Sequence, residues 1–182
     1  MTKRLVLLLA TAALLGFDVS SQAYAQATVY ISGGAAIPTS DFGDFADTGW
    51  MAAGGVLFDV GPSGLGVGAE VFYGQNSHKD EFSLFENAKT TPYGAMAIVD
   101  YAFGSAGAIR PYLFGGLGLL VHKFSADNIE SESDSQFGYQ FGGGVSFPIG
   151  ATTSLYAEGR YMGAEDTKYF GVLGGLAFGL GN

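Results

Sequence analysis

The sequence predicts an all-β protein, an eight-stranded antiparallel transmembrane β-barrel of the up-and-down type. Three observations predict it. Of the 182 residues, 48% are hydrophobic, 14% are charged and 30 are Gly, which is unfavourable for helices because Gly costs roughly 1 kcal/mol at each helical position. Apolar residues alternate with polar or small ones in eight segments, which is the period of a β-strand. The connections between these segments are alternately short and long, as expected of strands that run up and down across a membrane.

Residues 1–25 are predicted to be a signal peptide. Lys3 and Arg4 supply its positive charge, residues 5–17 form an apolar run, and Ala23-Tyr24-Ala25 has the small-x-small pattern of a cleavage site. The apolar run is shorter than the roughly 20 residues that a spanning helix needs. Residues 26–182 are then expected to form one barrel domain.

The predicted strands each have about ten residues or more, which suits tilted membrane strands. They are residues 27–37, 49–59, 65–74, 89–103, 109–122, 136–147, 152–162 and 168–180. The alternation is clearest in residues 136–147, where Phe, Tyr and Val alternate with Gln, Gly and Ser. In the fourth and fifth strands the inward and outward faces stay open, because apolar residues share a face with Asp100 and Arg110.

The connections divide into two groups that lie at opposite ends of the predicted barrel. Short Gly, Pro and Ser turns occur at residues 60–64, 104–108 and 148–151, and longer polar loops occur at 38–48, 75–88 and 123–135, with an acidic one at 163–167. In outer-membrane barrels the short turns are periplasmic. The long loops are therefore predicted to lie outside the cell.

Closing eight strands into a ring removes the sheet edges and pairs every backbone group, which hydrocarbon requires. The apolar faces then meet lipid, and the lumen is just wide enough for side chains. Two bands of interfacial aromatic residues are predicted near the strand ends. They are Trp50, Tyr73, Tyr101, Phe103, Phe137, Phe147, Tyr161, Phe170 and Phe178.

Five charged residues fall on the predicted inward faces: Glu70, Asp100, Arg110, Glu158 and Arg160. An unpaired charge that faces lipid costs several kcal/mol, so an inward position is strongly favoured. We expect these residues to form hydrogen-bonded ion pairs in the lumen. Such a charge network either fills the lumen statically or acts as a gate that rearranges to pass water or small ions.

The charge and the residue types exclude several classes of function. The net charge of −9 argues against nucleic acid, and 12 of the 17 Asp and Glu residues lie in the four longer loops. The absence of Cys excludes disulfide scaffolds and thiol catalysis. His78 and His122 are the only histidines, and no phosphate-binding, hydrolase or metalloprotease motif is present. We therefore expect no catalytic residue, no metal and no cofactor.

Three parts of the sequence carry a resemblance to a known family: the signal peptide, residues 33–43 (Gly-Gly-Ala-Ala-Ile-Pro-Thr-Ser-Asp-Phe-Gly) and residues 110–118 (Arg-Pro-Tyr-Leu-Phe-Gly-Gly-Leu-Gly). Through them the chain resembles the small OmpA/OmpX-like outer-membrane β-barrel domain family, also called the porin family. The resemblance covers essentially all of residues 26–182 and defines a fold rather than an activity. It implies the outer membrane of a Gram-negative-type bacterium. The implied partners are outer-membrane lipids, periplasmic chaperones and the barrel insertion machinery, and an extracellular ligand of the loops stays open. Family members commonly end in an aromatic residue, whereas this chain ends Phe-Gly-Leu-Gly-Asn.

The sequence predicts a non-enzymatic barrel with a side-chain-filled lumen and a structural or surface-interaction role through its acidic loops. The alternatives are a narrow pore for water, ions or a small solute, and a lipid-modifying enzyme that uses His78 or His122. A soluble, lipocalin-like carrier is a third.

Overall fold

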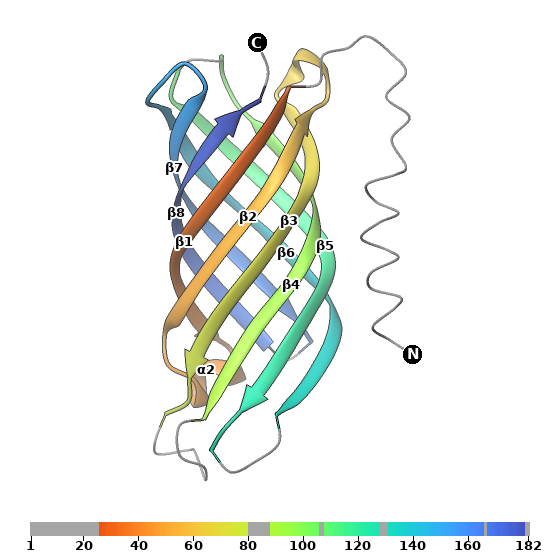
Figure 1. Ribbon diagram of the computed structural model, residues 1–182, viewed down its shortest axis with the longest axis vertical. Coiled ribbons are helices and arrows are strands. Elements are labelled where there is room, and N and C mark those ends of the chain that lie inside the picture. Colours follow the sequence, from red (N-terminus) through yellow and green to blue (C-terminus); the bar gives the residue numbers. More distant parts are fainter. Residues whose placement is uncertain (1–25, 80–87, 106–107, 128–130, 166, 181–182) are drawn as a thin grey trace.

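The structure, a computed structural model, describes residues 26–79, 88–105, 108–127, 131–165 and 167–180. These residues form a closed antiparallel barrel in which each strand pairs with the next along the chain and the last pairs with the first (Figure 1). The strands are β1 (Ala27–Thr39), β2 (Gly49–Asp59), β3 (Leu65–Ser77), β4 (Lys89–Ala102), β5 (Arg110–Ser125), β6 (Glu132–Pro148), β7 (Thr153–Ala164) and β8 (Thr167–Gly179). The predicted fold class is confirmed.

Pairing of β1 with β8 closes the barrel. The register runs from Thr28 opposite Gly179 to Thr39 opposite Lys168, and the Leu180 N–H donates to the Ala27 carbonyl at 2.6 Å. The start of β1 and the end of β8 therefore lie at the same end of the barrel as the short turns, at the top of Figure 1. No helix in the described part of the chain is long and apolar enough to cross a membrane. The predicted signal peptide lies outside the described residues.

The observed strands differ from the predicted ones mainly at the long-loop end. β2 has the predicted bounds, whereas β3 continues to Ser77 and β6 begins at Glu132. These extensions consist of polar residues, so the apolar alternation that marks the membrane part does not reveal them. The first long loop also contains a short helix, α2 (Asp41–Phe45), that the sequence did not predict.

The alternation of side chains settles the open question in the fourth and fifth strands. In β4, Met96 and Ile98 are buried while Val99 and Tyr101 are exposed. In β5, the neighbours of the exposed Leu113 point inward. The apolar residues that share a face with Asp100 and Arg110 therefore lie in the lumen rather than against lipid.

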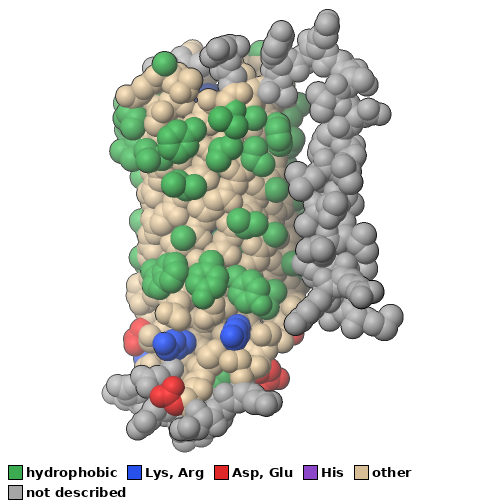
Figure 2. Space-filling view, viewed as in Figure 1, with side chains coloured by type: hydrophobic (Ala, Val, Ile, Leu, Met, Phe, Trp, Pro, Cys, Tyr) green, Lys and Arg blue, Asp and Glu red, His purple; other side chains and the backbone are tan. Residues whose placement is uncertain are grey.

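The outer surface carries two apolar bands, one near each end of the strands (Figure 2). Eight of the nine predicted interfacial aromatics are exposed, and the ninth, Tyr161, is half-buried against Phe141 with ring centroids 5.5 Å apart. At the long-loop end Trp50 contacts Tyr73, and Tyr73 stacks on Tyr93. Bands of this kind match the two interfaces of a bilayer.

Glycine makes room for three tyrosine rings inside the barrel. A Cβ atom added to Gly55 would lie 2.6 Å from the Tyr30 hydroxyl, and one added to Gly144 would lie 2.7 Å from the Tyr112 hydroxyl. A Cβ atom at Gly175 would lie 2.6 Å from Cζ of Tyr156. Each ring thus lies directly over a glycine of a neighbouring strand. The high Gly content serves this close packing in a narrow lumen.

Candidate functional site: a lumen closed by two layers

The charged layer of the lumen is centred on Arg160, which β7 directs inward. Arg160 is 1% exposed and Glu70 is 2% exposed, although they are 90 residues apart in the sequence. The two Nη atoms of Arg160 donate to the two carboxylate oxygens of Glu70 at 2.6 and 3.0 Å. This is the parallel, two-bond geometry that makes Arg–carboxylate pairs strong.

All five N–H groups of Arg160 have an acceptor. Besides the two bonds to Glu70, Nε donates to Glu158 at 2.8 Å, Nη2 also contacts Glu158, and Nη1 donates to the Gln140 side chain at 3.2 Å. A guanidinium has five donors and no acceptor. The buried cation is therefore fully satisfied, and this removes the main cost of placing it in the lumen.

The two carboxylates are also satisfied by neutral donors. Glu70 accepts from the Tyr30 hydroxyl at 3.1 Å and from the Gln140 amide at 2.9 Å, and Glu158 accepts from the Tyr112 hydroxyl at 2.8 Å. These neutral donors offset the second carboxylate, which one guanidinium cannot balance alone. Residues from β1, β3, β5, β6 and β7 meet in this layer, so it connects opposite walls of the barrel.

An apolar layer fills the lumen on the long-loop side of the charged layer, and one of its members, Ile98, also lines the vestibule at the other end. Its members are fully or almost fully buried and come from almost every strand. They are Ala36, Met51, Ala53, Phe72, Met96, Ile98, Leu120, Met162, Ala164, Tyr169 and Leu173. Phe114 packs against this layer, and Cζ of the Arg160 guanidinium lies 5.2 Å from the centre of the Phe114 ring. The two layers are therefore continuous.

Helix α2 covers the long-loop end of the apolar layer. Its Phe42 packs edge-on against Tyr169 and His78, with ring centroids 5.2 and 6.3 Å apart. The buried Asn76 amide donates to the Asp47 carbonyl at 2.9 Å, and Lys79 Nζ donates to the Gly43 carbonyl at 2.8 Å. The first loop is thus held across the mouth of the barrel.

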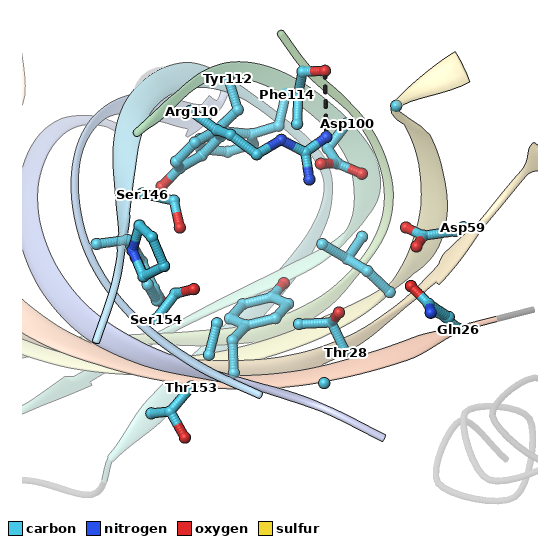
Figure 3. A pocket seen from close by; sticks show the side chains of 18 of the residues that line it. Gln26, Thr28, Asp59, Asp100, Arg110, Tyr112, Phe114, Ser146, Thr153 and Ser154 are labelled. Carbon is cyan, nitrogen blue, oxygen red and sulfur yellow. Dashed lines mark hydrogen bonds between the residues drawn. The ribbon is translucent and has the colours of Figure 1, made fainter. Parts of the chain in front are cut away.

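The opposite end of the lumen is open. A vestibule of about 340 Å³ lies between the short turns and ends on the charged layer, as its walls include Glu70, Glu158 and Arg160. Figure 3 looks into it and shows Asp59, Asp100 and Arg110 around the opening. The lumen is therefore a blind cavity that opens toward the short turns.

Two of the five predicted lumen charges lie apart from the charged layer. Asp100 is four residues along β4 from Met96, which is the residue opposite Glu70. It therefore lies about 13 Å farther along the strand toward the short turns. The Arg110 Nη2 donates to the Ala102 carbonyl at 3.4 Å (Figure 3), and the described residues give it no ion pair within 4.0 Å. The structure brings Glu70, Glu158 and Arg160 together and places Asp100 and Arg110 in the vestibule.

Sequence reasoning missed the neutral members of the charged layer, Tyr30, Tyr112 and Gln140. Gln140 lies on the polar face of the most clearly alternating segment, which is a weak signal for a lumen position. Tyr112 shares a face with Arg110, and the sequence left the direction of that face open. Tyr30 carried no signal, because an aromatic residue in a membrane strand also fits the lipid face. The inward direction of both tyrosines is shown by the exposed residues beside them in the strand, Ile31 next to Tyr30 and Leu113 next to Tyr112.

The two histidines lie at the long-loop end among aromatic rings. His78 Nε2 is 2.7 Å from the Thr90 hydroxyl, and His122 stacks on Tyr169. Burial lowers the pKa of His78 below its usual value. Thr90 is 6% exposed, so this pair is shielded from a substrate. Within the described residues, no group of three His, Asp or Glu side chains is arranged to hold a metal.

Comparison with solved structures shows similarity to outer-membrane barrels. Neisserial surface protein A matches with a TM-score of 0.67 and 16% identity, over 85% of this chain and 97% of that one. Ail of Yersinia pestis, crystallised with the heparin analogue sucrose octasulfate, matches with a TM-score of 0.58 and 16% identity, over 86% and 99%. OprG of Pseudomonas aeruginosa matches with 0.57 and 15%, over 88% and 99%. At these identities the likeness concerns the fold.

No curated protein sequence matches the chain. Residues 9–179 match the family model described as the outer membrane protein beta-barrel domain. This match spans nearly the whole chain, and it agrees with the closed eight-stranded architecture and with the resemblance seen in the sequence. The chain belongs to the outer membrane protein β-barrel domain family.

Proposed function

We propose that this protein is a non-enzymatic outer-membrane barrel with a permanently closed lumen, which acts through its structure and through its extracellular loops. The observation that carries the proposal is the pair of consecutive layers inside the barrel. A permeating ion would have to displace both the fully bonded Arg160 and the apolar residues around Leu120. Either displacement costs several kcal/mol, because it strands buried charges or opens a packed core.

The long loops are the surface that we propose for contacts outside the cell. They hold 12 of the 17 acidic residues of the chain. The related fold of Ail was crystallised with a polyanion, and acidic loops disfavour such a ligand by charge repulsion. We infer that the loops of this protein favour partners with a cationic surface.

The hypothesis of a lipid-modifying enzyme is less favoured than that of a non-enzymatic barrel. Such an enzyme needs a base within hydrogen-bond reach of a nucleophile that a substrate can approach. The described histidines contact aromatic rings, and the Thr90 hydroxyl beside His78 is buried. Replacement of His78 and His122 by Ala should leave the lipid profile of expressing cells unchanged.

The proposal can be tested in a strain that lacks the gene. The strain is complemented with the wild-type chain, with a loop variant in which Asp41, Asp44, Asp47, Glu132 and Asp134 are changed to the corresponding amides, or with an Arg110→Gln control. Binding of cells to a polylysine-coated surface measures the loop contacts, and resistance to detergent measures envelope integrity. We expect the loop variant to lose binding and to keep detergent resistance. Equal binding by the loop variant and the wild type would contradict the role of the loops.

A narrow pore is the second candidate, and the open vestibule favours it. In that case the vestibule would be one end of a channel, and the two layers would be its gate. Conductance across a planar bilayer distinguishes the two functions, because only the pore predicts discrete channel openings.

A further inference from the structure

A groove on the outer wall of the barrel lies at the long-loop end of β3, β4 and β5. It has a volume of about 550 Å³, and its lining includes Tyr73, Tyr93, Lys89, Lys123 and Ser125. These side chains lie on the same face of the strands as the exposed Val71 and Val99, so they point away from the lumen. The groove is therefore separate from both the lumen layers and the vestibule.

Two lysines converge in this groove. Lys89 pairs with Ser125 across β4 and β5, and Lys123 lies two residues along β5 from that position. Diagonal neighbours of this kind are about 7–8 Å apart, which is within the reach of two flexible side chains toward one anion. Among the described residues, neither ammonium has an ion pair within 4.0 Å.

The lysines lie at the height of lipid headgroups. Tyr73 and Tyr93 stack in the aromatic band, with ring centroids 6.4 Å apart, and such rings mark the edge of the hydrocarbon. Lys123 pairs with Thr91, so it is two positions beyond Tyr93, and Lys89 is four positions beyond it. At about 3.3 Å per residue, the two lysines begin about 7 and 13 Å past Tyr93 along the strands, which at a tilt of about 45° is about 5 and 9 Å along the membrane normal. The polar region on each side of the hydrocarbon is about 5–8 Å thick, so Lys123 begins within it and Lys89 begins at its outer edge. Figure 2 shows Lys or Arg side chains just beyond the lower apolar band.

The outward-facing charges differ between the two ends of the barrel. In the described strands, Lys89, Lys123 and Lys168 face outward at the long-loop end. The corresponding positions near the short turns are aromatic, for example Phe58 and Phe178. Cations at one interface alone favour a membrane whose leaflet on that side is anionic.

We propose that the groove is a binding site for the phosphate monoester of an outer-leaflet lipid headgroup. A phosphate monoester presents three terminal acceptor oxygens and a phosphodiester presents two, so two ammonium groups with a neighbouring hydroxyl match the monoester better. Ser125 adds a hydroxyl, and the tyrosine rings offer flat surfaces to the part of the lipid next to the phosphate. Asp127 also lines the groove, so the charged side chains of the described lining sum to +1, which still favours an anion. This site is independent of the proposed loop contacts.

The test uses protein purified from the membrane fraction of expressing cells and held in neutral detergent micelles. Lipid A with its two phosphate monoesters is titrated, and native mass spectrometry measures the lipid-bound fraction. Parallel titrations use dephosphorylated lipid A, phosphatidylglycerol and inorganic phosphate. We expect one bound lipid A that the other three probes do not replace.

Three variants test the assignment of the lysines. The double variant Lys89→Gln with Lys123→Gln should bind lipid A roughly 30-fold more weakly. The double variant with Arg at both positions should keep the affinity within a few-fold, and Lys168→Gln on β8 should leave it unchanged. Heat-modifiable migration on gels shows that each variant is folded, and the Arg variant tests the site even if the Gln variant does not fold.

Equal binding by the Gln double variant and the wild type would overturn the proposal. So would an equal loss in Lys168→Gln, because the effect would then be general electrostatic attraction. Equal binding of dephosphorylated lipid A or phosphatidylglycerol would exclude recognition of the monoester. Displacement of the lipid by millimolar inorganic phosphate would show a site for the free anion instead.

Discussion

Arg160 and Glu70 face each other across the lumen from β7 and β3 and share two hydrogen bonds of 2.6 and 3.0 Å, although 90 residues separate them in the chain. Gln140 and Glu158 accept the remaining N–H bonds of Arg160. This pair connects two walls of the barrel that share no strand pairing. It is therefore a long-range constraint on the closed ring as well as a barrier in the lumen.

The first prediction concerns this pair. Replacement of Arg160 by Met leaves two carboxylates buried without their cation, so the free energy of unfolding should fall by about 3–5 kcal/mol. Urea unfolding in micelles, followed by the fluorescence of Trp50, measures the change. Arg110→Met is the matched control and should cost much less, because within the described residues Arg110 makes one long hydrogen bond in the open vestibule. Equal losses for both variants would contradict the central role of Arg160.

The second prediction concerns the apolar layer. Leu120 is 0% exposed and Leu117, on the same strand, is 55% exposed and faces outward. Leu120→Ala should lower the free energy of unfolding by about 2–5 kcal/mol, because it leaves a cavity in a packed core. Leu117→Ala should cost less, because lipid chains can fill the space. A larger effect at Leu117, measured by the same unfolding curves, would show that the lumen is loosely packed.

The third prediction concerns the glycines beneath the tyrosine rings. Gly175→Ala would place a methyl group 2.2 Å from the Ile31 carbonyl oxygen and 2.6 Å from the Tyr156 ring, and it should destabilise the barrel by about 1–3 kcal/mol. At the neighbouring Gly174 the nearest atom to an added Cβ is 3.7 Å away, so Gly174→Ala should be close to neutral. The transition temperature of heat-modifiable gel migration compares the two variants. Equal stability would mean that the Tyr156 ring and the backbone at Ile31 both move aside at no cost.

The fourth prediction concerns the response of α2 to acid. Burial lowers the pKa of His78 below its usual 6.5, so the folded contact with Phe42, Phe124 and Thr90 favours the neutral ring. The contribution of His78 is present above pH 6.5 and is lost as the pH falls toward the depressed folded pKa. Amide exchange of α2, corrected for the intrinsic rate, should therefore speed up on acidification relative to β2. His78→Gln keeps a hydrogen-bonding group that does not titrate in this range. This variant should therefore show a smaller increase in the amide exchange of α2 on acidification. An unchanged response in this variant would assign it to other groups.

The strands were largely predictable from the sequence because lipid imposes a strict alternation on them. β2 has the predicted bounds, and the faces of β3 around Glu70 and of β7 around Arg160 are as the alternation indicated. Where the strands leave the membrane that constraint ends, so the start of β6 at Glu132 was missed. Helix α2 was missed as well, since it has five residues, includes Gly43 and has no side-chain cap.

The inward residues were predictable, but their partners were not. The charge of Glu70, Glu158 and Arg160 points each of them to the lumen, because lipid does not tolerate it. Which residues meet depends on the stagger of the closed barrel. The stagger lets Gln140 donate a hydrogen bond to Glu70, and it leaves Asp100 four residues along β4 from the position opposite Glu70. The tyrosines over Gly55 and Gly144 depend on the same stagger. Alternation within one strand carries no information about that stagger.

The most direct test of the closed lumen is planar-bilayer recording of the reconstituted wild-type protein beside Glu158→Ala. In Glu158→Ala the bonds from Arg160 to Glu70 and the whole apolar layer remain. We therefore predict that neither protein produces discrete channel openings across the voltage range that the bilayer tolerates. Reproducible unitary openings of the wild type, or openings that the Glu158→Ala change makes more frequent, would contradict the closed lumen and identify the charged layer as a gate.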